Sequence, residues 1–299
     1  METFRSMKAI ALINFQRWKR DYRIWLIFAF TAILIVEYLK GYTIYGMEEG
    51  KKLTFCLLPL LYIPTEVSLR APKILWHVGF LLLLCDAPFM HQTAPYMILR
   101  SQRKRWWKGE CLYIISVAFI YMSFITLVSS LVALPAVSLE NDWGPAITDI
   151  IFGTDSQTVE EILNSYTIGI FAPEEVIKYL YPFASEGYTF LTGWGTFCVL
   201  GLLLYFVRII QKSVLVGLGI TGVFIFLDPI LTILAEPDKY WLQVFSPVCW
   251  TSLDLLNVLS SKHFLSIPFL LIMYPVLIIS ILFLIKWRSR KVIIEVKVL

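Results

Sequence analysis

Residues 86–110 read DAPFMHQTAPYMILRSQRKRWWKGE and separate two apolar runs, Lys73 to Met90 and Cys111 to Leu134. Five cations and two adjacent tryptophans gather in the second half of this stretch: Arg100, Arg103, Lys104, Arg105 and Lys108, with Trp106 and Trp107. Short loops rich in Lys and Arg stay on the cytoplasmic side of a membrane, and Trp favours the headgroup boundary. Residues 91–110 are therefore interpreted as a cytoplasmic elbow, which either holds a cytoplasmic partner or serves only as a positive-inside anchor.

The composition places the whole chain in a membrane. Hydrophobic residues make up 58% of the 299 residues and charged residues only 16%, whereas soluble domains carry roughly 45–50% apolar and about 25% charged residues. Several apolar runs reach the ~20 residues that a helix needs to cross ~30 Å of hydrocarbon. The fold class is therefore an all-α polytopic membrane protein, and the cations, which cluster beside spans and aromatic rings, do not indicate a nucleic-acid partner.

Six transmembrane helices are predicted in two groups, within residues 24–134 and 188–287. The spans are Ile24 to Leu39, Lys73 to Met90, Cys111 to Leu134, Tyr188 to Val207, Val214 to Ala235 and Leu265 to Trp287. An amphipathic helix over residues 4–18, within an interfacial segment 1–23, precedes the first span. Most of the 26 Lys and Arg residues fall in the inner segments, so both termini, including the tail 288–299, are expected in the cytoplasm.

Three segments are expected on the outer side. Residues 41–72 contain a short apolar run broken by prolines, which favours an outer or re-entrant segment that leans on the membrane. Residues 135–187 carry nine acids opposed by Lys178 alone, which predicts a small external acidic subdomain. Residues 240–259 are interpreted as a second membrane-leaning element.

The chain has no motif for catalysis or nucleotide binding. GxxxxGK[ST], HExxH and GxSxG are absent, and no Cys or His spacing indicates a metal. The chain is therefore not expected to be an enzyme, and no catalytic residue, metal ligand or cofactor is predicted within it. A disulfide between Cys56 and Cys249 stays open.

Ionisable groups within or beside the predicted spans suggest function by default. Asp86 ends the second span. It pairs with the cations of 100–108, caps the turn before Pro88, or signals engagement of a partner. Asp228 precedes a proline in the fifth span and either satisfies backbone groups freed by that proline or lines a substrate path. His77 is expected to be a satisfied histidine of the helix bundle.

Two motifs near the elbow, LLLLCDAPFM at 81–90 and PYMILRSQRKRWWKGECLYII at 95–115, carry a family resemblance, as does SPVCWTSLDLLN at 246–257. Together with the layout of spans, the chain resembles type-2 ABC permeases, the membrane subunits of ABCG-like exporters. The local match is to a Gram-positive bacterial branch found with peptide-antibiotic export or self-immunity systems.

The resemblance implies a permease subunit in the cell membrane that pairs with a second permease and docks a separate ATPase, which binds ATP and Mg. The cargo would be a peptide or amphipathic substrate. The docking residues would be Arg100, Arg103, Lys104, Arg105, Trp106 and Glu110, and Asp86 and Asp228 would serve coupling or the substrate path. The acidic segment 135–187 could meet a cationic peptide. Two alternatives stay open: a non-transporting immunity or sensor protein, and a secondary transporter.

Overall fold

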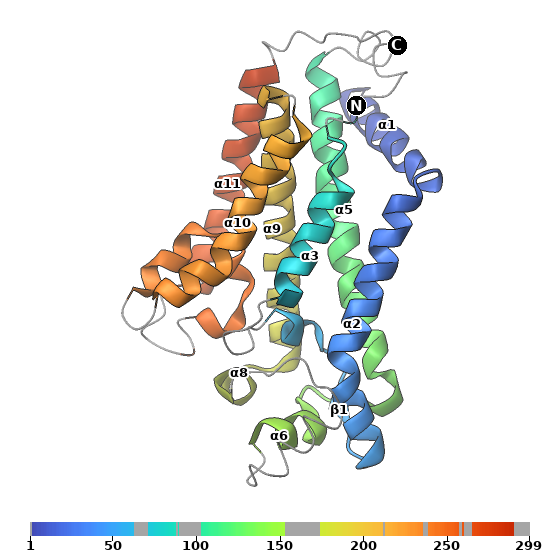
Figure 1. Ribbon diagram of the computed structural model, residues 1–299, viewed down its shortest axis with the longest axis vertical. Helices are drawn as coiled ribbons and strands as arrows, with labels where there is room; N and C mark the ends of the chain where they lie inside the picture. The colour runs from blue at the N-terminus through green and yellow to red at the C-terminus, as the bar shows by residue number, and fades with distance from the viewer. Residues whose placement is uncertain are drawn as a thin grey trace.

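The computed structural model describes residues 2–62, 71–87, 89, 103–152, 174–211, 213–235, 239–256, 259 and 265–289. Within these ranges, five helices are long and apolar enough to cross a membrane. They are α2 (Tyr22–Glu48), α5 (Arg103–Ala133), α9 (Pro182–Gln211), α10 (Val214–Ala235) and α11 (Ile267–Ser289). They run side by side along the long axis of the molecule (Figure 1). The chain is therefore a helical membrane protein, as its composition predicts.

Helix α9 is the centre of the bundle and packs against α5, α10 and α11. Its middle turns are fully buried, and two glycines there let neighbours approach closely. A Cβ atom at Gly195 would lie 2.8 Å from the ring of Tyr274 on α11, and one at Gly201 would lie 2.7 Å from Ile114 on α5. Small residues at helix contacts serve packing in lipid, where no hydrophobic effect drives helices together.

The predicted span Lys73 to Met90 corresponds to a shorter helix, α3 (Ala71–Leu83). Its 13 residues extend for about 20 Å, less than the ~30 Å of hydrocarbon. The chain turns at residues 84–87, where arginines from two other helices bind the Cys85 carbonyl and the Asp86 carboxylate. Helix α3 contacts α2, α9 and α10, so it is an inner element of the bundle.

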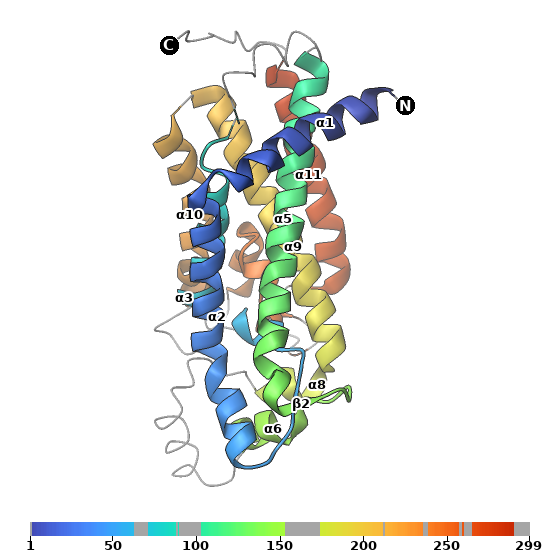
Figure 2. The same ribbon diagram turned by 90° about the vertical axis from the view of Figure 1, so that its right-hand side faces the viewer.

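Helix α1 (Glu2–Gln16) crosses α5 obliquely instead of following the bundle axis (Figure 2). Ile10 and Ala11 on its apolar face are buried, and Gly109 of α5 gives Ile10 the room it needs. The short helix η1 (Arg17–Lys19) follows, and Trp18 donates a hydrogen bond to the Tyr113 hydroxyl at 2.9 Å. The predicted amphipathic helix is thus present, and its apolar face packs on protein.

The two ends of the bundle differ. Helix α1 and the last turns of α11 lie at one end, here called the α1 end (Figure 1). The opposite end, the β1 end, carries β1 (Leu53–Thr54) paired in parallel with β2 (Val137–Ser138), which follows η3 (Leu134–Ala136). Helices α6 (Gly144–Phe152) and α8 (Glu174–Tyr179) complete this end. The predicted subdomain 135–187 falls here, although its residues 153–173 lie outside the described ranges.

The elements at the β1 end, namely β1, β2, α6 and α8, are here called the cap, and a glycine joins the cap to the segment that follows α2. Gly144 has φ +76°, and a Cβ atom there would lie 2.5 Å from the carbonyl oxygen of Lys52. Only glycine adopts such a backbone conformation at so close an approach without strain. The amide of Ala146 also donates to the Lys52 carbonyl at 3.1 Å, so α6 begins against the segment that follows α2.

Two irregular segments enter the bundle from the β1 end. One contains η2 (Leu58–Leu61), whose four residues are buried against α9 and α5. The other contains η4 (Tyr240–Phe245), η5 (Cys249–Thr251) and η6 (Leu253–Leu255), of which η4 packs on α10 and η5 on α9. Both coincide with the segments interpreted as leaning on the membrane. Helix η2 and most of η5 and η6 are buried in protein, where irregular backbone avoids lipid, whereas η4 exposes the side chains of Trp241 and Phe245.

Candidate functional site

The predicted docking residues that the structure describes, Arg103 to Trp106 and Glu110, lie at the α1 end, on the first turns of α5. Arg100 is outside the described residues, and for Arg103 and Lys104 only the helical backbone is described. Arg105 is partly exposed, whereas Trp106 and Trp107 are largely buried. Lys108 lies 5.8 Å from the centre of the Trp107 ring, a cation–π contact. Trp106 is therefore a packing residue here, and exposed contact at this turn comes from the cations.

Glu110 does not lie on an exposed face. Its side chain is only 1% exposed, and its carboxylate accepts a hydrogen bond from the Asn14 side chain of α1 at 3.2 Å. Because Asn14 is buried as well, this contact and the Ile10–Gly109 packing hold α1 against α5. Glu110 thus positions α1, and the expectation of a direct docking contact needs this correction.

Asp86 joins three segments at the α1 end. Its carboxylate accepts a hydrogen bond from Arg23 of α2 at 2.6 Å and lies 3.6 Å from Arg17 of η1. Arg208 at the end of α9 donates to the neighbouring Cys85 carbonyl. The pKa of Asp86 is lowered, chiefly because Arg23 donates to the charged carboxylate. The described cationic partners of Asp86 are Arg23 and Arg17, and the Cys85 thiol also donates to its carboxylate at 3.8 Å. Neither Arg105 nor Lys108, the elbow cations whose side chains are described, pairs with Asp86.

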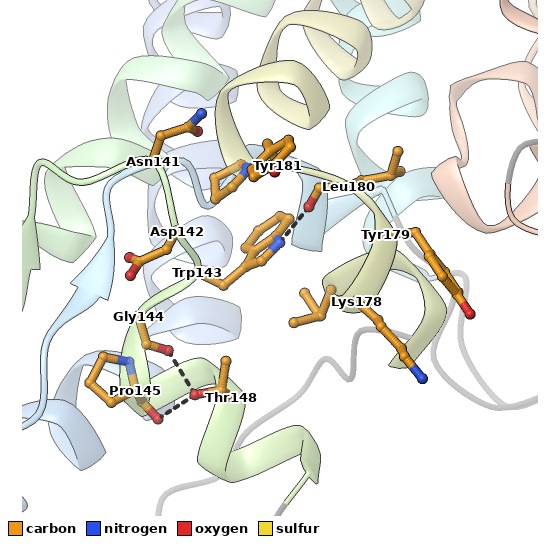
Figure 3. A pocket seen from close by; sticks show the side chains of 12 residues that line it. Asn141, Asp142, Trp143, Gly144, Pro145, Thr148, Lys178, Tyr179, Leu180 and Tyr181 are labelled. Carbon is orange, nitrogen blue, oxygen red and sulfur yellow. Dashed lines mark hydrogen bonds between the residues drawn. The ribbon is translucent and has the colours of Figure 1, made fainter.

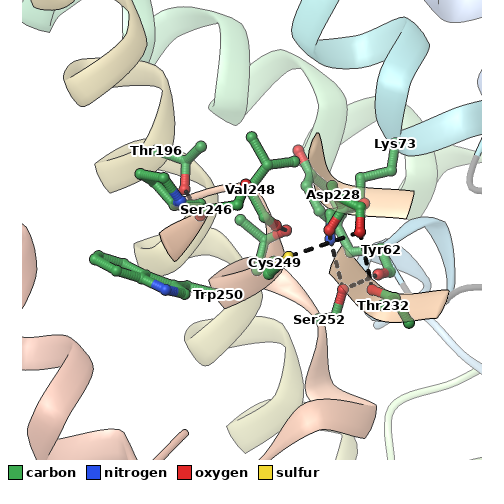
Figure 4. A network of polar contacts seen from close by, with 12 residues as sticks. Tyr62, Lys73, Thr196, Asp228, Thr232, Ser246, Val248, Cys249, Trp250 and Ser252 are labelled. Atoms are coloured by element: carbon green, nitrogen blue, oxygen red, sulfur yellow. Dashed lines mark hydrogen bonds and ion pairs between the residues drawn. The ribbon is translucent and has the colours of Figure 1, made fainter. Parts of the chain in front are cut away.

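A buried polar network lies deep in the bundle, near the start of α3 (Figure 4). The Lys73 ammonium lies 3.0 Å from an Asp228 carboxylate oxygen and donates to the Ser252 hydroxyl at 2.6 Å. The Ser252 hydroxyl in turn donates to the Tyr62 carbonyl at 3.2 Å. The side chains of Lys73 and Asp228 are at most 2% exposed. The network therefore ties α3 and α10 to both irregular segments.

The backbone around Asp228 is also satisfied. Pro229 follows within α10, and the Asp228 carbonyl accepts hydrogen bonds from Thr232 at 2.9 Å and from the Cys249 thiol at 3.8 Å. The Asp228 carboxylate therefore forms the ion pair with Lys73, and the side chains of Thr232 and Cys249 satisfy the Asp228 carbonyl. Neither of the two roles predicted for Asp228 included this ion pair.

His77 lies one turn beyond Lys73 and is fully buried. Its Nδ1 is 2.6 Å from the Lys73 carbonyl oxygen, and its ring lies 5.0 Å from that of Phe197. His77 is thus packed within the bundle, with one of its two ring nitrogens bonded. Its Nε2 has no hydrogen-bond partner among the described residues.

Lys73 is the residue that the sequence analysis missed. Its position at the start of an apolar run placed it at a span boundary, where lysine normally reaches water. The signal was the pair of opposite charges in or beside predicted spans, Lys73 and Asp228, because a charge within the membrane is usually paired.

All five cysteines are free thiols, and Cys56 and Cys249 are buried without a disulfide between them. Among the described residues, no group of three or more His, Cys, Asp or Glu side chains could hold a metal ion.

A pocket of about 580 Å³ opens at the β1 end, between α6, the loop before it and the junction of α8 with α9 (Figure 3). The Trp143 indole donates to the Leu180 carbonyl at 2.8 Å and joins the two sides of the pocket. The Phe183 amide donates to the Asn141 side chain at 3.2 Å and joins the loop to α9. These contacts preform the pocket, which lies within the range of ~300–1,000 Å³ usual for ligand sites.

The rim of this end is tied to α2 by an ion pair. Lys51 lies 3.0 Å from Asp149 of α6 and donates to the Tyr45 hydroxyl at 3.1 Å. The pKa of Lys51 is raised, first by the hydrogen bond with Tyr45 and then by that with Asp149.

A second hollow, of about 680 Å³, lies between α9 and α11 and is almost wholly apolar. The hydroxyls of Tyr188 and Tyr274, which line it, are already bonded to carbonyl groups of the segment 240–256. Nothing in its walls selects a particular ligand.

Comparison with protein-family models, with curated proteins and with solved structures finds no match to this chain.

Proposed function

We propose that this chain is the membrane-spanning permease subunit of an ATP-driven exporter of the type-2 ABC class, with ATP and Mg bound by a separate subunit. The observation that carries the proposal is the position of α1, which crosses α5 at its first turns and contacts Gly109 and Glu110 there. An interfacial helix and a basic helix start, packed together at one end of a helical bundle, form a surface suited to a cytoplasmic subunit.

The connectivity supports six crossings of the membrane. Five are the long helices, and the sixth is the return from β1 through η2 and α3, which leads the chain from the β1 end toward the α1 end (Figure 1). Both termini then lie on the α1 side. Because the basic residues concentrate on that side, it faces the cytoplasm of a cell membrane.

The docking surface consists of the cations on the elbow and the first turns of α5, namely Arg100, Arg103, Lys104 and Arg105. Glu110 and Trp106 act behind this surface. A shift of α5 reaches α1 through Glu110 and Asn14, and Asp86 links the η1–α2 junction to the end of α3. Asp86 is thus a coupling residue. Asp228, through its ion pair with Lys73, holds α3 against α10 when α5 shifts.

The cargo class follows from the resemblance: a peptide or amphipathic compound, exported or cleared from the membrane by a pair of permease subunits. The pairing partner is a second copy or a homologous chain.

Purification from native membranes in mild detergent tests the proposal. The wild-type protein should carry a nucleotide-binding subunit and hydrolyse ATP. Reversal of two charges at the elbow, Arg103→Glu with Arg105→Glu, should release that subunit and abolish the hydrolysis. The matched reversal of two exposed lysines far from the elbow in sequence, Lys52→Glu with Lys239→Glu, should leave both unchanged.

Two outcomes would overturn the proposal. The wild-type protein could purify without an ATPase, or the reversed elbow could retain it. Activity of the chain without an ATPase would favour the immunity or sensor function, and transport driven by a proton or sodium gradient would favour a secondary transporter.

A further inference from the structure

The pocket at the β1 end has walls that suit an amphipathic ligand. The buried Trp143 indole forms its base, with Ile177 and Pro145 beside it. The Tyr181 side chain is 69% exposed, and Figure 3 shows it beside Trp143. Among the described residues its hydroxyl has no hydrogen-bond partner. Aromatic and proline surfaces of this kind bind apolar side chains at low entropic cost.

The charges around the pocket favour a cationic ligand. Asp142 lines the pocket, and Glu140, Glu174 and Glu175 are exposed nearby. Among the described residues, none of these four acids forms a salt bridge. The one cation in the lining, Lys178, lies 5.7 Å from the centre of the Tyr179 ring. The potential at the mouth of the pocket is therefore negative and attracts positive charge.

We propose that this pocket binds a cationic amphipathic peptide, with apolar side chains against Trp143 and Tyr181 and basic side chains against Asp142 and its acidic neighbours. This inference rests on the proposed function for its role in transport, since the β1 end then faces outward and the peptide is the cargo. Binding itself needs no ATP.

The chain's own segment 153–173 is the competing occupant, because it connects α6 with α8. Its sequence carries three acids, Asp155, Glu160 and Glu161, and no Lys or Arg. The acids at the rim repel this acidic segment and attract a basic peptide.

The test uses the full-length protein in nanodiscs of neutral phosphatidylcholine, so that anionic lipid does not bind the probe. The probe is a fluorescent hexapeptide of alternating Arg and Trp, compared by anisotropy with its counterpart of alternating Gln and Trp. The Arg peptide should bind with a Kd at least about tenfold lower than the Gln peptide.

Two variants locate the binding. Glu140→Gln with Asp142→Asn should weaken binding of the Arg peptide about tenfold, and Tyr181→Ala should weaken binding of both peptides. Both alter exposed side chains, so they leave the fold intact. The matched controls are Glu49→Gln, an exposed acid beyond the pocket, and Tyr22→Ala, an exposed tyrosine at the α1 end; neither should change the Kd.

Equal affinity for the two peptides, or equal loss in variants and controls, would overturn the inference. Stronger binding of the Arg peptide after replacement of residues 153–173 by a Gly/Ser linker would also overturn it in its present form, because that segment would then be the resident occupant. Failure here with an ATPase still bound at the elbow would remove only the peptide site. Binding without any ATPase would remove the exporter and leave the site.

Discussion

Lys73 and Asp228 place two opposite charges where water does not reach. They join the short helix α3 to the long helix α10. Removing one ion of a buried pair leaves the other uncompensated, whereas replacing both by apolar residues of similar volume is often neutral. The pair therefore specifies where α3 meets α10 and the segment around Ser252, more than it adds net stability.

Asp228→Asn or Lys73→Met alone should lower the free energy of unfolding by about 3–5 kcal/mol, because each leaves one buried charge without its counterion. The double substitution Lys73→Met with Asp228→Leu should recover most of that loss. Thermal unfolding of the detergent-solubilised protein measures the difference. The control is Lys239→Met, which replaces an exposed lysine and should change the free energy of unfolding little. A double variant as unstable as the sum of the two single variants would contradict the argument.

Asp86→Asn should cost about 1 kcal/mol or less, because the Asp86 pair with Arg23 is partly exposed and screened by water. With a folded-state pKa below the ordinary ~3.9, the Asp86 carboxylate contributes stability above that pH. The contribution is lost as the pH falls through the lowered value. Unfolding midpoints between pH 7 and pH 3 should therefore converge for the wild type and Asp86→Asn. A gap that stays constant over this range would refute the assignment.

Sequence reasoning at this scale found the ionisable residues but not their partners. Asp86 and Asp228 were recognisable as charges in apolar surroundings, yet Lys73 lies 155 residues from Asp228. No local pattern encodes a contact over that separation. Glu110 was misassigned for a related reason, since a residue in a basic stretch reads as exposed until α1 is placed over it.

At the scale of elements, the close contact of α1 with α5 depends on a glycine. A Cβ atom at Gly109 would lie 2.6 Å from the Cβ atom of Ile10, whereas one at Gly219 of α10 would meet nothing within 4 Å. The two positions offer the same substitution in two different surroundings.

Gly109→Ala should displace α1 and destabilise the protein by about 1–3 kcal/mol through overpacking, less the gain in helix propensity. Gly219→Ala should be neutral or stabilising by up to ~1 kcal/mol, because it gains propensity without a clash. Thermal unfolding of both variants, together with limited proteolysis of the first 20 residues, checks the pair. Equal behaviour of the two would show that α1 is not seated on α5 as described.

Long apolar helices were predictable from length and hydropathy, and five of the six predicted spans appear as such helices. The shortness of helix α3 was not predictable, because the sequence of an apolar run buried inside protein resembles that of a run that faces lipid. The segment at 41–72 was recognised as irregular by its prolines, but the burial of η2 depends on α5 and α9, far along the chain.

At the scale of the whole molecule, the two ends must lie on opposite sides of the membrane. Four of the native cysteines are buried and Cys85 is half-buried, so a Cys85→Ala background leaves few reactive thiols. In that background, an impermeant maleimide should label Lys52→Cys in intact cells and Ser101→Cys only after permeabilisation. Labelling of Ser101→Cys in intact cells would reverse the orientation and remove the docking surface from the side that holds ATP.

The class of helical membrane protein was accessible from hydropathy, because the bilayer sets the length of an apolar helix that crosses it. The orientation expected from loop charge stays a prediction. For the cap at the β1 end, the sequence predicts a subdomain over residues 135–187 but not the contacts within it. Its pocket arises from contacts of Trp143 with Leu180 and of Asn141 with Phe183, which no composition reveals.

The parallel pairing of Leu53 with Val137 has a consequence for biogenesis. A ribosome adds roughly 5–20 residues per second, so β1 is synthesised several seconds before β2 exists. During that interval β1 has no strand to pair with. The pairing forms only after α5, which precedes β2 in the chain, has been made and placed.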